Sequence, residues 1–300
     1  MAFQTRAAIT GVTGYIGRGL PALLAAKGMA VTGVSRSGKG EAAGVDRWQT
    51  PDQLDFSGCG AVINLAGEPI NQRWTEEKRR RFRESRVDHT RKVVAAIGRL
   101  PASERPRVLV SGSAVGFYGD GKDEFLTEEA PAGSDYLSEL CRDWEEAASE
   151  AQGLGVRVVT LRTGVVLGRG GDAFEKLRKI FGMGLGGRLG DGHQWMPWIH
   201  VDDLRAAIIH AVVSESLAGP VNGSAPAPER NRDFTRKLAS AMHRPAIFPV
   251  PAFALRLVLG DFATALLSSQ RAVPSALVAD GFRFRFETLE EALPDLLDKG

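Results

Sequence analysis

The chain has 300 residues, of which 43% are hydrophobic and 25% charged, and its formal net charge is +2. That length is enough for one large domain or two interleaved ones, and the near-neutral charge favours neither a nucleic-acid nor a membrane partner. No apolar run reaches the ~20 residues that span a bilayer, no signal-peptide core is present at the start, and the two cysteines are too few for a disulfide framework or a cysteine metal site. We therefore expect a cytoplasmic protein without a metal site.

A glycine triad follows the first predicted strand. Residues 7–17 read A-A-I-T-G-V-T-G-Y-I-G, and a helix is predicted over 20–26. Gly11 permits the tight turn, Gly14 lets a phosphate approach the backbone, and Gly17 lets the helix pack on the strand. Free N–H groups and the positive end of the helix dipole then face a pyrophosphate, so the motif predicts a dinucleotide site.

The end of the second predicted strand, residues 30–34, indicates which dinucleotide binds. An acidic residue there holds a ribose 2′-hydroxyl, whereas an arginine accommodates a 2′-phosphate. This chain has Ser35 followed by Arg36, and its next carboxylate is Glu41. Arginine offers a fork of donors to phosphate and serine adds a hydroxyl, so the sequence favours NADP over NAD. The alternative is that Arg36 is only a solvated loop charge.

Strand and helix signals alternate along the first half of the chain, which predicts an α/β fold with helices on both faces of a parallel sheet. Strands are predicted over 61–67, 107–111, 156–162, 199–203 and 219–222, and helices over 75–100, 136–151 and 204–213. Residues 182–192 contain six glycines and predict a mobile loop that orders over a substrate. The remainder is predicted to be mostly helical, with proline breaks.

The carboxyl end of the third strand along the chain, predicted over 61–67, is a second candidate cofactor contact. Asn64, Leu65, Ala66 and Gly67 lie at the carboxyl end of the strand, where such sheets bind ligands, and their small size suits the adenosine half of the cofactor. An ordinary strand-end turn is the alternative. The basic run over 78–86 is interrupted by acidic residues, so a solvated helix face is favoured over a nucleic-acid site.

Two hydroxyls are candidates for the chemistry. Ser113 follows the fourth strand, and Tyr136 comes 23 residues later at the start of a helix. From these positions a serine can hydrogen-bond a substrate carbonyl while a tyrosine passes it a proton. The alternative is that Tyr136 only packs against the fold.

With these residues assembled, the chain resembles the extended branch of the short-chain dehydrogenase/reductase superfamily. More closely, it is similar to the atypical NAD(P)-dependent epimerase/dehydratase-like proteins that carry an extra C-terminal domain of uncharacterised function. The resemblance covers essentially the whole chain. It rests on T-G-V-T-G-Y-I-G, V-I-N-L-A-G-E-P-I, R-W-T-E-E-K, E-S-R-V-D-H-T-R, L-R-T-G-V-V-L-G, G-D-G-H-Q-W-M-P-W-I-H-V-D-D-L and Q-R-A-V-P-S-A-L-V-A-D-G-F-R-F.

The resemblance implies a Rossmann-type, doubly wound parallel sheet with bound NADP and a small C-terminal substrate lobe. It places the NADP-binding domain in 1–165, with 199–222 returning to it, and the lobe in 166–198 and 223–300. Beside the two candidate catalytic residues, it implies the following cofactor contacts: Gly11, Thr13, Gly14, Tyr15, Ile16, Gly17, Ser35, Arg36, Asn64, Leu65, Ala66, Gly67, Arg86 and Val165.

Two departures from the superfamily pattern bear on function. Leu140 stands where the tyrosine signature Y-x-x-x-K has its lysine, which holds the nicotinamide ribose and lowers the tyrosine pKa; Arg86 is a candidate to supply the missing charge. Met196 stands where nucleotide-sugar members have the arginine that binds the substrate pyrophosphate, although Arg188 is a candidate to reach a phosphate. His200 is expected to be a structural residue.

We therefore expect an NADP-dependent oxidoreductase that acts on a small carbonyl or alcohol. A catalytically weak NADP-binding sensor or scaffold is the alternative, and a nucleotide-sugar epimerase is disfavoured. A small-molecule substrate is the expected partner, without nucleic acid or membrane, and a homodimer is left open.

Overall fold

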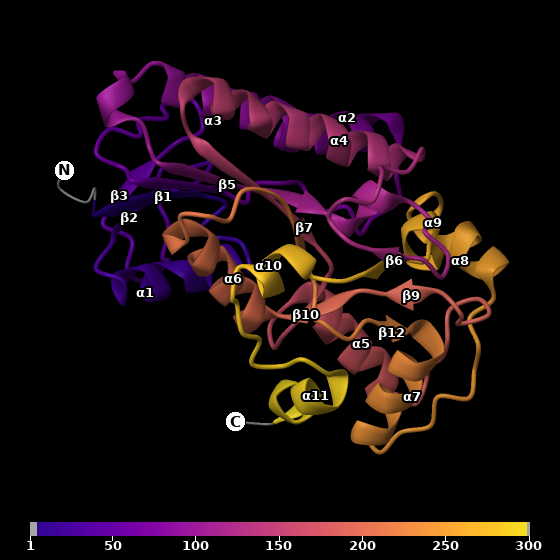
Figure 1. Cartoon of the computed structure of the whole chain (residues 1–300). Helices are drawn as coiled ribbons and strands as arrows, with labels where there is room; N and C mark the ends of the chain where they lie inside the picture. The colour runs from indigo at the N-terminus through magenta and orange to yellow at the C-terminus, as the bar shows by residue number, and fades with distance from the viewer. Residues whose placement is uncertain (1–4, 299–300) are drawn as a thin grey trace.

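A seven-stranded parallel sheet forms the centre of the protein (Figure 1), a computed structural model that describes residues 5–298. Its strand order is β11-β7-β5-β4-β1-β2-β3, and every neighbouring pair is parallel. The strands are β1 (Arg6–Thr10), β2 (Ala30–Val34), β3 (Arg47–Gln49), β4 (Ala61–Asn64), β5 (Val108–Ala114), β7 (Arg157–Thr163) and β11 (Gly219–Gly223). The order reverses between β1 and β4, and ligands bind beyond the carboxyl ends of the strands at such a reversal.

Helices cover both faces of the sheet, which confirms the doubly wound α/β prediction (Figure 1). One face carries α2 (Glu76–Arg83), the π-helical turn Glu84–Asp88, α3 (His89–Gly98) and α4 (Tyr136–Ser149). The other carries α1 (Leu20–Ala25), α6 (Val201–Val213) and α10 (Ser275–Ala279). Thr75 caps α2 as its sequence predicts, since its side chain accepts a hydrogen bond from the Lys78 amide.

Alternation along the strands builds one apolar core on each face. Ile9 and Val110 pack with α1 and α6, whereas Leu109 packs with Val93 of α3 and Ala148 of α4. Successive strand residues point to opposite faces, so parallel strands covered on both sides are apolar at nearly every position. The carboxyl edge of this sheet is thereby held rigid.

A smaller lobe with its own core packs beside that edge. Its elements include α5 (Asp172–Gly182), β8 (Val165–Leu167), β9 (Trp195–Met196), β10 (Trp198–His200), β12 (Glu229–Arg230), α7 (Asn231–Ala241), α8 (Ala252–Leu259), α9 (Phe262–Leu267) and α11 (Leu289–Leu297). Phe174, Trp198, Phe234 and Leu289 centre its core. Short ladders join β10 to β8, β12 to β9, and β13 (Arg271–Ala272) to β6 (Phe125–Leu126).

The chain after residue 270 is shared between the lobe and the Rossmann-type domain. Leu277 of α10 is buried in the same core as Ile9 and Val110. Asp203 of α6 accepts hydrogen bonds from the Arg285 amide at 2.8 Å and the Phe286 amide at 3.0 Å. The C-terminal segment therefore crosses from the lobe onto the face of the sheet and back to α11.

The glycine-rich segment 182–192 is hydrogen-bonded to the chain before α8 and to α7, and its mobility without substrate stays a prediction. The Val250 amide donates to the Arg188 carbonyl at 2.8 Å, the Gly190 amide donates to the Val250 carbonyl at 2.9 Å, and the Leu189 amide donates to Asn231 Oδ1 at 2.7 Å. A Cβ at Gly187 would lie 1.6 Å from the Phe248 carbonyl oxygen. Here glycine serves close backbone approach between two segments, and not only freedom of motion.

Candidate cofactor and substrate site

The glycine loop forms a tight cradle between β1 and α1. Gly11 has φ +73°, and a Cβ on it would lie 2.9 Å from the backbone of Leu65 and Ala66. A Cβ on Gly14 would lie 3.1 Å from the Gly11 carbonyl oxygen, and one on Gly17 would lie 2.3 Å from it. All three glycines are thus required by local geometry, as the dinucleotide motif predicts.

Arg205 of α6 holds this loop from behind. Its guanidinium donates to the Ile16 carbonyl at 3.1 Å and to the Tyr15 carbonyl at 2.7 Å. Thr13 and Gly14 are exposed in the loop. The Tyr15 hydroxyl donates to the Arg169 carbonyl at 3.1 Å, so this side chain bridges the loop to the lobe. Sequence analysis missed Arg205, because its role depends on the packing of α6 beside α1.

Ser35 and Arg36, which follow β2, have different roles in the structure. The Ser35 hydroxyl donates to the Lys39 carbonyl at 2.7 Å and accepts from the Lys39 amide at 3.1 Å, so it closes the turn. Arg36 is exposed, and within residues 5–298 it has no ion-pair partner. Gly40 brings the turn against Thr13, whose methyl group would lie 3.2 Å from a Cβ at that glycine. The turn that carries Arg36 therefore lies against the glycine loop.

The end of β4 contributes backbone, and its asparagine is structural. Asn64 is buried, accepts from the Thr10 hydroxyl at 2.6 Å and donates to the Thr90 hydroxyl at 2.8 Å. Leu65 and Ala66 run beside Gly11, as the Cβ distances above show. Together these contacts place the ends of β1 and β4 side by side at the reversal of the sheet.

Arg86 reaches this edge from the helix opposite. It lies in the π-helical turn between α2 and α3, and a Cβ on Gly67 would lie 3.2 Å from its guanidinium carbon. The guanidinium stacks over the Trp144 ring at 5.3 Å and has no carboxylate within ion-pair distance among the described residues. Burial lowers the pKa of Arg86 from its ordinary value, which indicates a desolvated cation.

Ser113 belongs to a buried polar network below the end of β5. Its hydroxyl donates to Glu145 Oε1 at 2.6 Å. Glu145 of α4 is also bound by Arg162 of β7, with Nε–Oε1 and Nη2–Oε2 distances of 2.8 Å. Arg162 donates in turn to the Tyr118 hydroxyl at 3.0 Å. This two-point carboxylate–guanidinium pair fixes the orientation of Ser113.

The Tyr136 hydroxyl is not part of the network that holds Ser113. Its hydroxyl donates to the Arg79 carbonyl at 3.1 Å, and its ring packs on Trp74 with centroids 5.4 Å apart. It lines a cavity of about 170 Å³ with Trp74, Arg79, Asp135, Leu137, Asp261, Thr264 and Ala265. Burial raises the pKa of Tyr136, which Arg79 and Arg86 partly oppose. Ser113 and Tyr136 have different hydrogen-bond partners, and the structure does not join them.

Cys141 faces the end of β5, one position after the Leu140 that stands in place of the signature lysine. Leu140 is buried with Phe82 and Trp144. The Cys141 thiol lies within hydrogen-bonding reach of Ser113, and a Cβ on Gly116 would lie 3.9 Å from its sulfur. Burial raises the pKa of Cys141 to about 12, so this thiol is neutral near pH 7. Both Leu140 and Cys141 are thus uncharged where the superfamily has lysine.

Val165 and Met196 lie on the lobe side of the edge. The Val165 amide donates to the Pro197 carbonyl at 2.8 Å, and Met196 pairs with Glu229 in the β9–β12 ladder. The guanidinium groups of Arg230 and Arg271 lie 4.6 and 4.3 Å from the Trp195 ring centre. Residue 196 thus brings no positive charge, but two arginines flank its neighbour.

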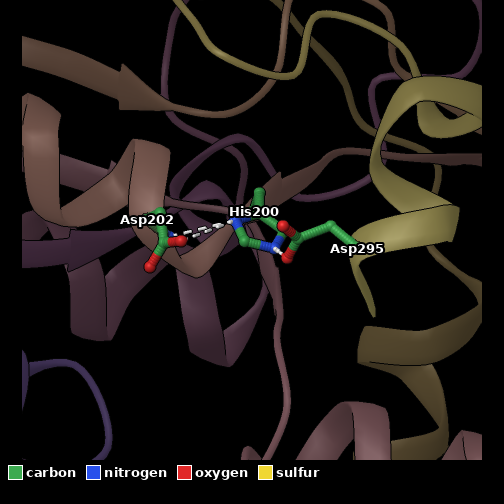
Figure 2. A group of neighbouring side chains, drawn as sticks. All are labelled: His200, Asp202 and Asp295. Carbon is green, nitrogen blue, oxygen red and sulfur yellow. Dashed lines mark hydrogen bonds and ion pairs between the residues drawn. The ribbon is translucent and has the colours of Figure 1, made fainter. Parts of the chain in front are cut away.

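His200 is the N-cap of α6, and its surroundings are a set of ion pairs (Figure 2). Its Nδ1 accepts from the Asp202 amide at 3.2 Å, and its Nε2 lies 3.3 Å from Asp295 Oδ2. Arg205 pairs with Asp202, and Arg285 pairs with both carboxylates. Burial lowers the pKa of His200. These carboxylates already have cationic partners, so the group serves to join α6 to α11.

Comparison with known proteins identifies the class to which this fold and edge belong. A model of the NAD dependent epimerase/dehydratase family matches residues 7–222, and a model of a domain of unknown function (DUF1731) matches residues 250–296. The chain therefore belongs to the NAD-dependent epimerase/dehydratase family. No helix within residues 5–298 is both long and apolar enough to cross a membrane.

Relatives of known name extend over nearly the whole chain. The chloroplastic SDR39U1 homolog of Arabidopsis thaliana, an epimerase family protein, is 41% identical over 97% of this chain and 86% of its own length. Human epimerase family protein SDR39U1 is 37% identical over 97% and 99%.

Solved structures agree with this placement. The crystal structure of human SDR39U1 (isoform 2) with NADPH has a TM-score of 0.88 and 34% identity, covering 97% of this chain and 98% of that chain. A nucleoside-diphosphate sugar epimerase from Corynebacterium glutamicum has a TM-score of 0.79 and 33% identity, and this chain spans 58% of its length.

Proposed function

We propose that the protein is an NADP(H)-dependent oxidoreductase that reduces a small carbonyl compound. The observation that carries the cofactor assignment is Arg36, an exposed arginine without a carboxylate partner in the described chain, on a turn whose Gly40 lies against the glycine loop. The residues fit a dinucleotide, because Gly11 and Leu65–Ala66 leave no room for a side chain at the end of β1. The human relative crystallised with NADPH supports the same choice.

The groups around Tyr136 suit reduction better than oxidation. When bound, NADPH supplies a hydride to the carbonyl carbon, and Tyr136 would give the carbonyl oxygen its hydroxyl proton, to be replaced from solvent. Because burial raises the pKa of Tyr136, the hydroxyl keeps its proton throughout the neutral range. The desolvated Arg86 would then stabilise negative charge developing on the oxygen.

The cavity beside Tyr136 suggests the size and kind of substrate. Its volume is about 170 Å³, and Trp74 and Leu137 provide apolar walls. Arg79 and Asp261 close one side with an ion pair of 2.6 Å. A small carbonyl compound with an aromatic or branched apolar group fits this lining, and the uncharged Met196 gives no support to a nucleotide sugar.

A second candidate function is an NADP-binding sensor with little turnover. The observation that favours it is the separation of the two hydroxyls, with Ser113 held by Glu145 and Tyr136 held by the Arg79 carbonyl. Leu140 and Cys141 also leave the lysine function without a replacement on α4.

Tyr136→Phe separates the two functions. With NADPH saturating and a panel of aromatic and branched carbonyl compounds, turnover should fall at least ~10²-fold, the low end for loss of a general acid. NADPH affinity should stay the same, since Tyr136 does not touch the glycine loop. Wild-type reduction should be level near neutrality and decline only above the ordinary tyrosine pKa of ~10, where the proton is lost.

A matched control is Ser149→Ala, which removes a hydroxyl at the other end of α4 that donates to the Glu146 carbonyl outside the Tyr136 cavity. Its turnover should stay within a few-fold of the wild type. Equal losses in both variants would remove Tyr136 from the mechanism. Tight NADPH binding with no turnover of any carbonyl would establish the sensor instead.

A further inference from the structure

A second cavity lies entirely within the lobe and is lined by four arginines. Its volume is about 550 Å³, and its lining comprises Arg188, Arg232, Thr235, Arg236, Ala239, Ser240, Arg244, Ala246, Ile247 and Pro249. The arginines come from three segments, namely the glycine-rich loop, α7 and the chain before α8. None of the lining residues belongs to the Rossmann-type domain, so hydride transfer does not take place here.

The charge in this cavity is largely uncompensated. Within residues 5–298, Arg188 and Arg244 have no carboxylate at ion-pair distance. Arg232 and Arg236 share a single carboxylate, that of Asp233, at 3.6 and 3.4 Å. Four guanidinium groups therefore face one carboxylate, which leaves three positive charges around one hollow. All four arginines are exposed to solvent, and together they make a positive field that attracts anions.

A hydroxyl in the wall is available to a ligand. Thr235 is only 5% exposed, yet it lines the cavity. Its hydroxyl has no hydrogen bond to another described residue and is not among the fully buried atoms that lack a partner, so solvent reaches it. It can therefore donate to an acceptor that enters the cavity.

The number of arginines and the apolar part of the lining indicate which kind of ligand the cavity binds. Arginine forks bind phosphate oxygens two at a time, and four of them exceed what one phosphate needs. Ala239, Ala246 and Pro249 add apolar surface to the lining. We propose that this cavity is a binding site for an organic diphosphate or polyphosphate, distinct from the cofactor groove. The charged groups would lie among the arginines and the carbon skeleton against the apolar wall.

Binding at this site would tie the glycine-rich loop to α7 and to the segment before α8. Arg188 follows Gly187, the residue that admits the Phe248 carbonyl. Arg244 lies at the start of that same segment, and Arg232 and Arg236 lie on the helix between them. An anion bridging these side chains would hold the lobe together, so the ligand is expected to raise the thermal stability of the protein.

The experiment uses the full chain saturated with NADP, so that the cofactor groove is filled. Inorganic pyrophosphate and tripolyphosphate are titrated by calorimetry and by thermal unfolding, with sodium chloride matched for ionic strength. Saturable binding and a higher Tm are expected with both probes, with tripolyphosphate tighter. Retention of NADP is followed in the same samples by its absorbance after filtration.

Two variants test the site itself. Arg188→Gln combined with Arg244→Gln should weaken tripolyphosphate at least about tenfold, since each arginine offers a charge-assisted hydrogen bond. The control is Arg91→Gln combined with Arg178→Gln, which changes the net charge equally at exposed positions outside the cavity. Thr235→Val, which leaves the charge unchanged, should weaken tripolyphosphate a few-fold.

The outcomes are distinguishable from failure of the proposed oxidoreductase. Loss of binding in the cavity variants with normal binding in the control supports the site, whatever the turnover of the wild type. Equal losses in the cavity and control variants would show general attraction to positive charge and overturn the site. Absence of saturable binding by the NADP-loaded wild type, or displacement of NADP by the probe, would also overturn it.

Discussion

Single residues decide the cofactor at the end of β2. The sequence offers Arg36 with Ser35 as an added hydroxyl, but Ser35 gives its hydroxyl proton to the Lys39 carbonyl, which leaves Arg36 as the donor to a phosphate. Arg36→Ala should therefore weaken NADPH by about 1.5–3 kcal/mol, the range for a charge-assisted hydrogen bond. NADH, which lacks the 2′-phosphate, should bind with nearly unchanged affinity.

Fluorescence titration of both cofactors measures this difference, with the exposed Arg91→Ala on α3 as the control for lost charge. Equal weakening of NADPH and NADH by Arg36→Ala would argue against a 2′-phosphate contact.

A buried histidine should make stability depend on pH. Burial lowers the pKa of His89 to about 4, with Lys92 adding to the effect, and its Nε2 is buried without a hydrogen-bond partner. The unfolded chain takes up this proton near pH 6.5 and the folded one only near pH 4, so stability is lost as pH falls through that window. The loss from this group is at most about 3 kcal/mol.

His89→Leu should remove that part of the pH dependence. Urea unfolding at pH 7, 5.5 and 4.5 should show that the free energy of unfolding falls less in the variant than in the wild type as pH is lowered. His243→Asn, a change at an exposed histidine, is the control and should follow the wild type. A stability difference between His89→Leu and the wild type that is constant with pH would exclude the role of His89.

Sequence reasoning at the residue scale was most successful where backbone geometry forces the residue type. Gly11, Gly14 and Gly17 each occupy a place that a Cβ would clash with, so their spacing alone was informative. The direction in which a helix side chain points is harder to predict from the sequence. Tyr136 and Cys141 differ by five positions on α4, and only the packing of that helix shows which one faces Ser113.

Among the elements, the contact between the glycine-rich segment 182–192 and the chain before α8 can be tested by a single substitution. Gly187→Ala would place a Cβ 1.6 Å from the Phe248 carbonyl oxygen, so one of the two segments must move. Overpacking of this kind typically lowers the free energy of unfolding by roughly 1–3 kcal/mol. Gly153→Ala is the matched control, because nothing lies within 4 Å of its Cβ position.

Denaturant unfolding of the two variants measures the effect. If Gly187→Ala is as stable as Gly153→Ala, the two segments are not held together in solution.

Most elements were predictable because their apolar runs are long and their ends are marked. The helix over 75–100 is present as α2, the π-helical turn and α3, with Thr75 as its N-cap. The edge strand β3 was missed, since Arg47–Gln49 has three residues and an exposed arginine, which gives no alternation to detect. The pairing of Leu189 with Val250 was also missed, because it joins positions far apart in the chain.

At the scale of the whole molecule, the C-terminal region that the DUF1731 model matches, residues 250–296, packs against the Rossmann-type domain. Leu277 fills the core on one face of the sheet, and Asn222 of β11 donates to the Val273 carbonyl at 2.9 Å. Deletion of residues 250–300 should therefore uncover the faces of α6 and β11 that α10 and the segment around Phe286 cover, although β11 keeps its pairing with β7. We expect the shortened chain to lose cooperative unfolding, with weak near-ultraviolet circular dichroism.

The full chain measured alongside is the reference, and NADPH binding reports on the remaining Rossmann-type domain. A shortened chain that unfolds cooperatively at the temperature of the full protein would show that the two regions are independent. Self-association as a homodimer stays a prediction, to be measured by sedimentation of the same samples.

The π-helical turn that carries Arg86 has a consequence for comparing sequences in this family. Each such turn contains one residue more than the α-helix around it needs, and such turns are frequent at functional sites. Deleting one residue of Glu84–Asp88 would let α2 and α3 join as one regular α-helix, and the bulge that carries Arg86 would be lost. The flanking turns would keep their faces, so Phe82 would stay in its core while Arg86 changed direction. Chain length here, and not residue identity alone, should distinguish relatives that share this cofactor edge from those that do not.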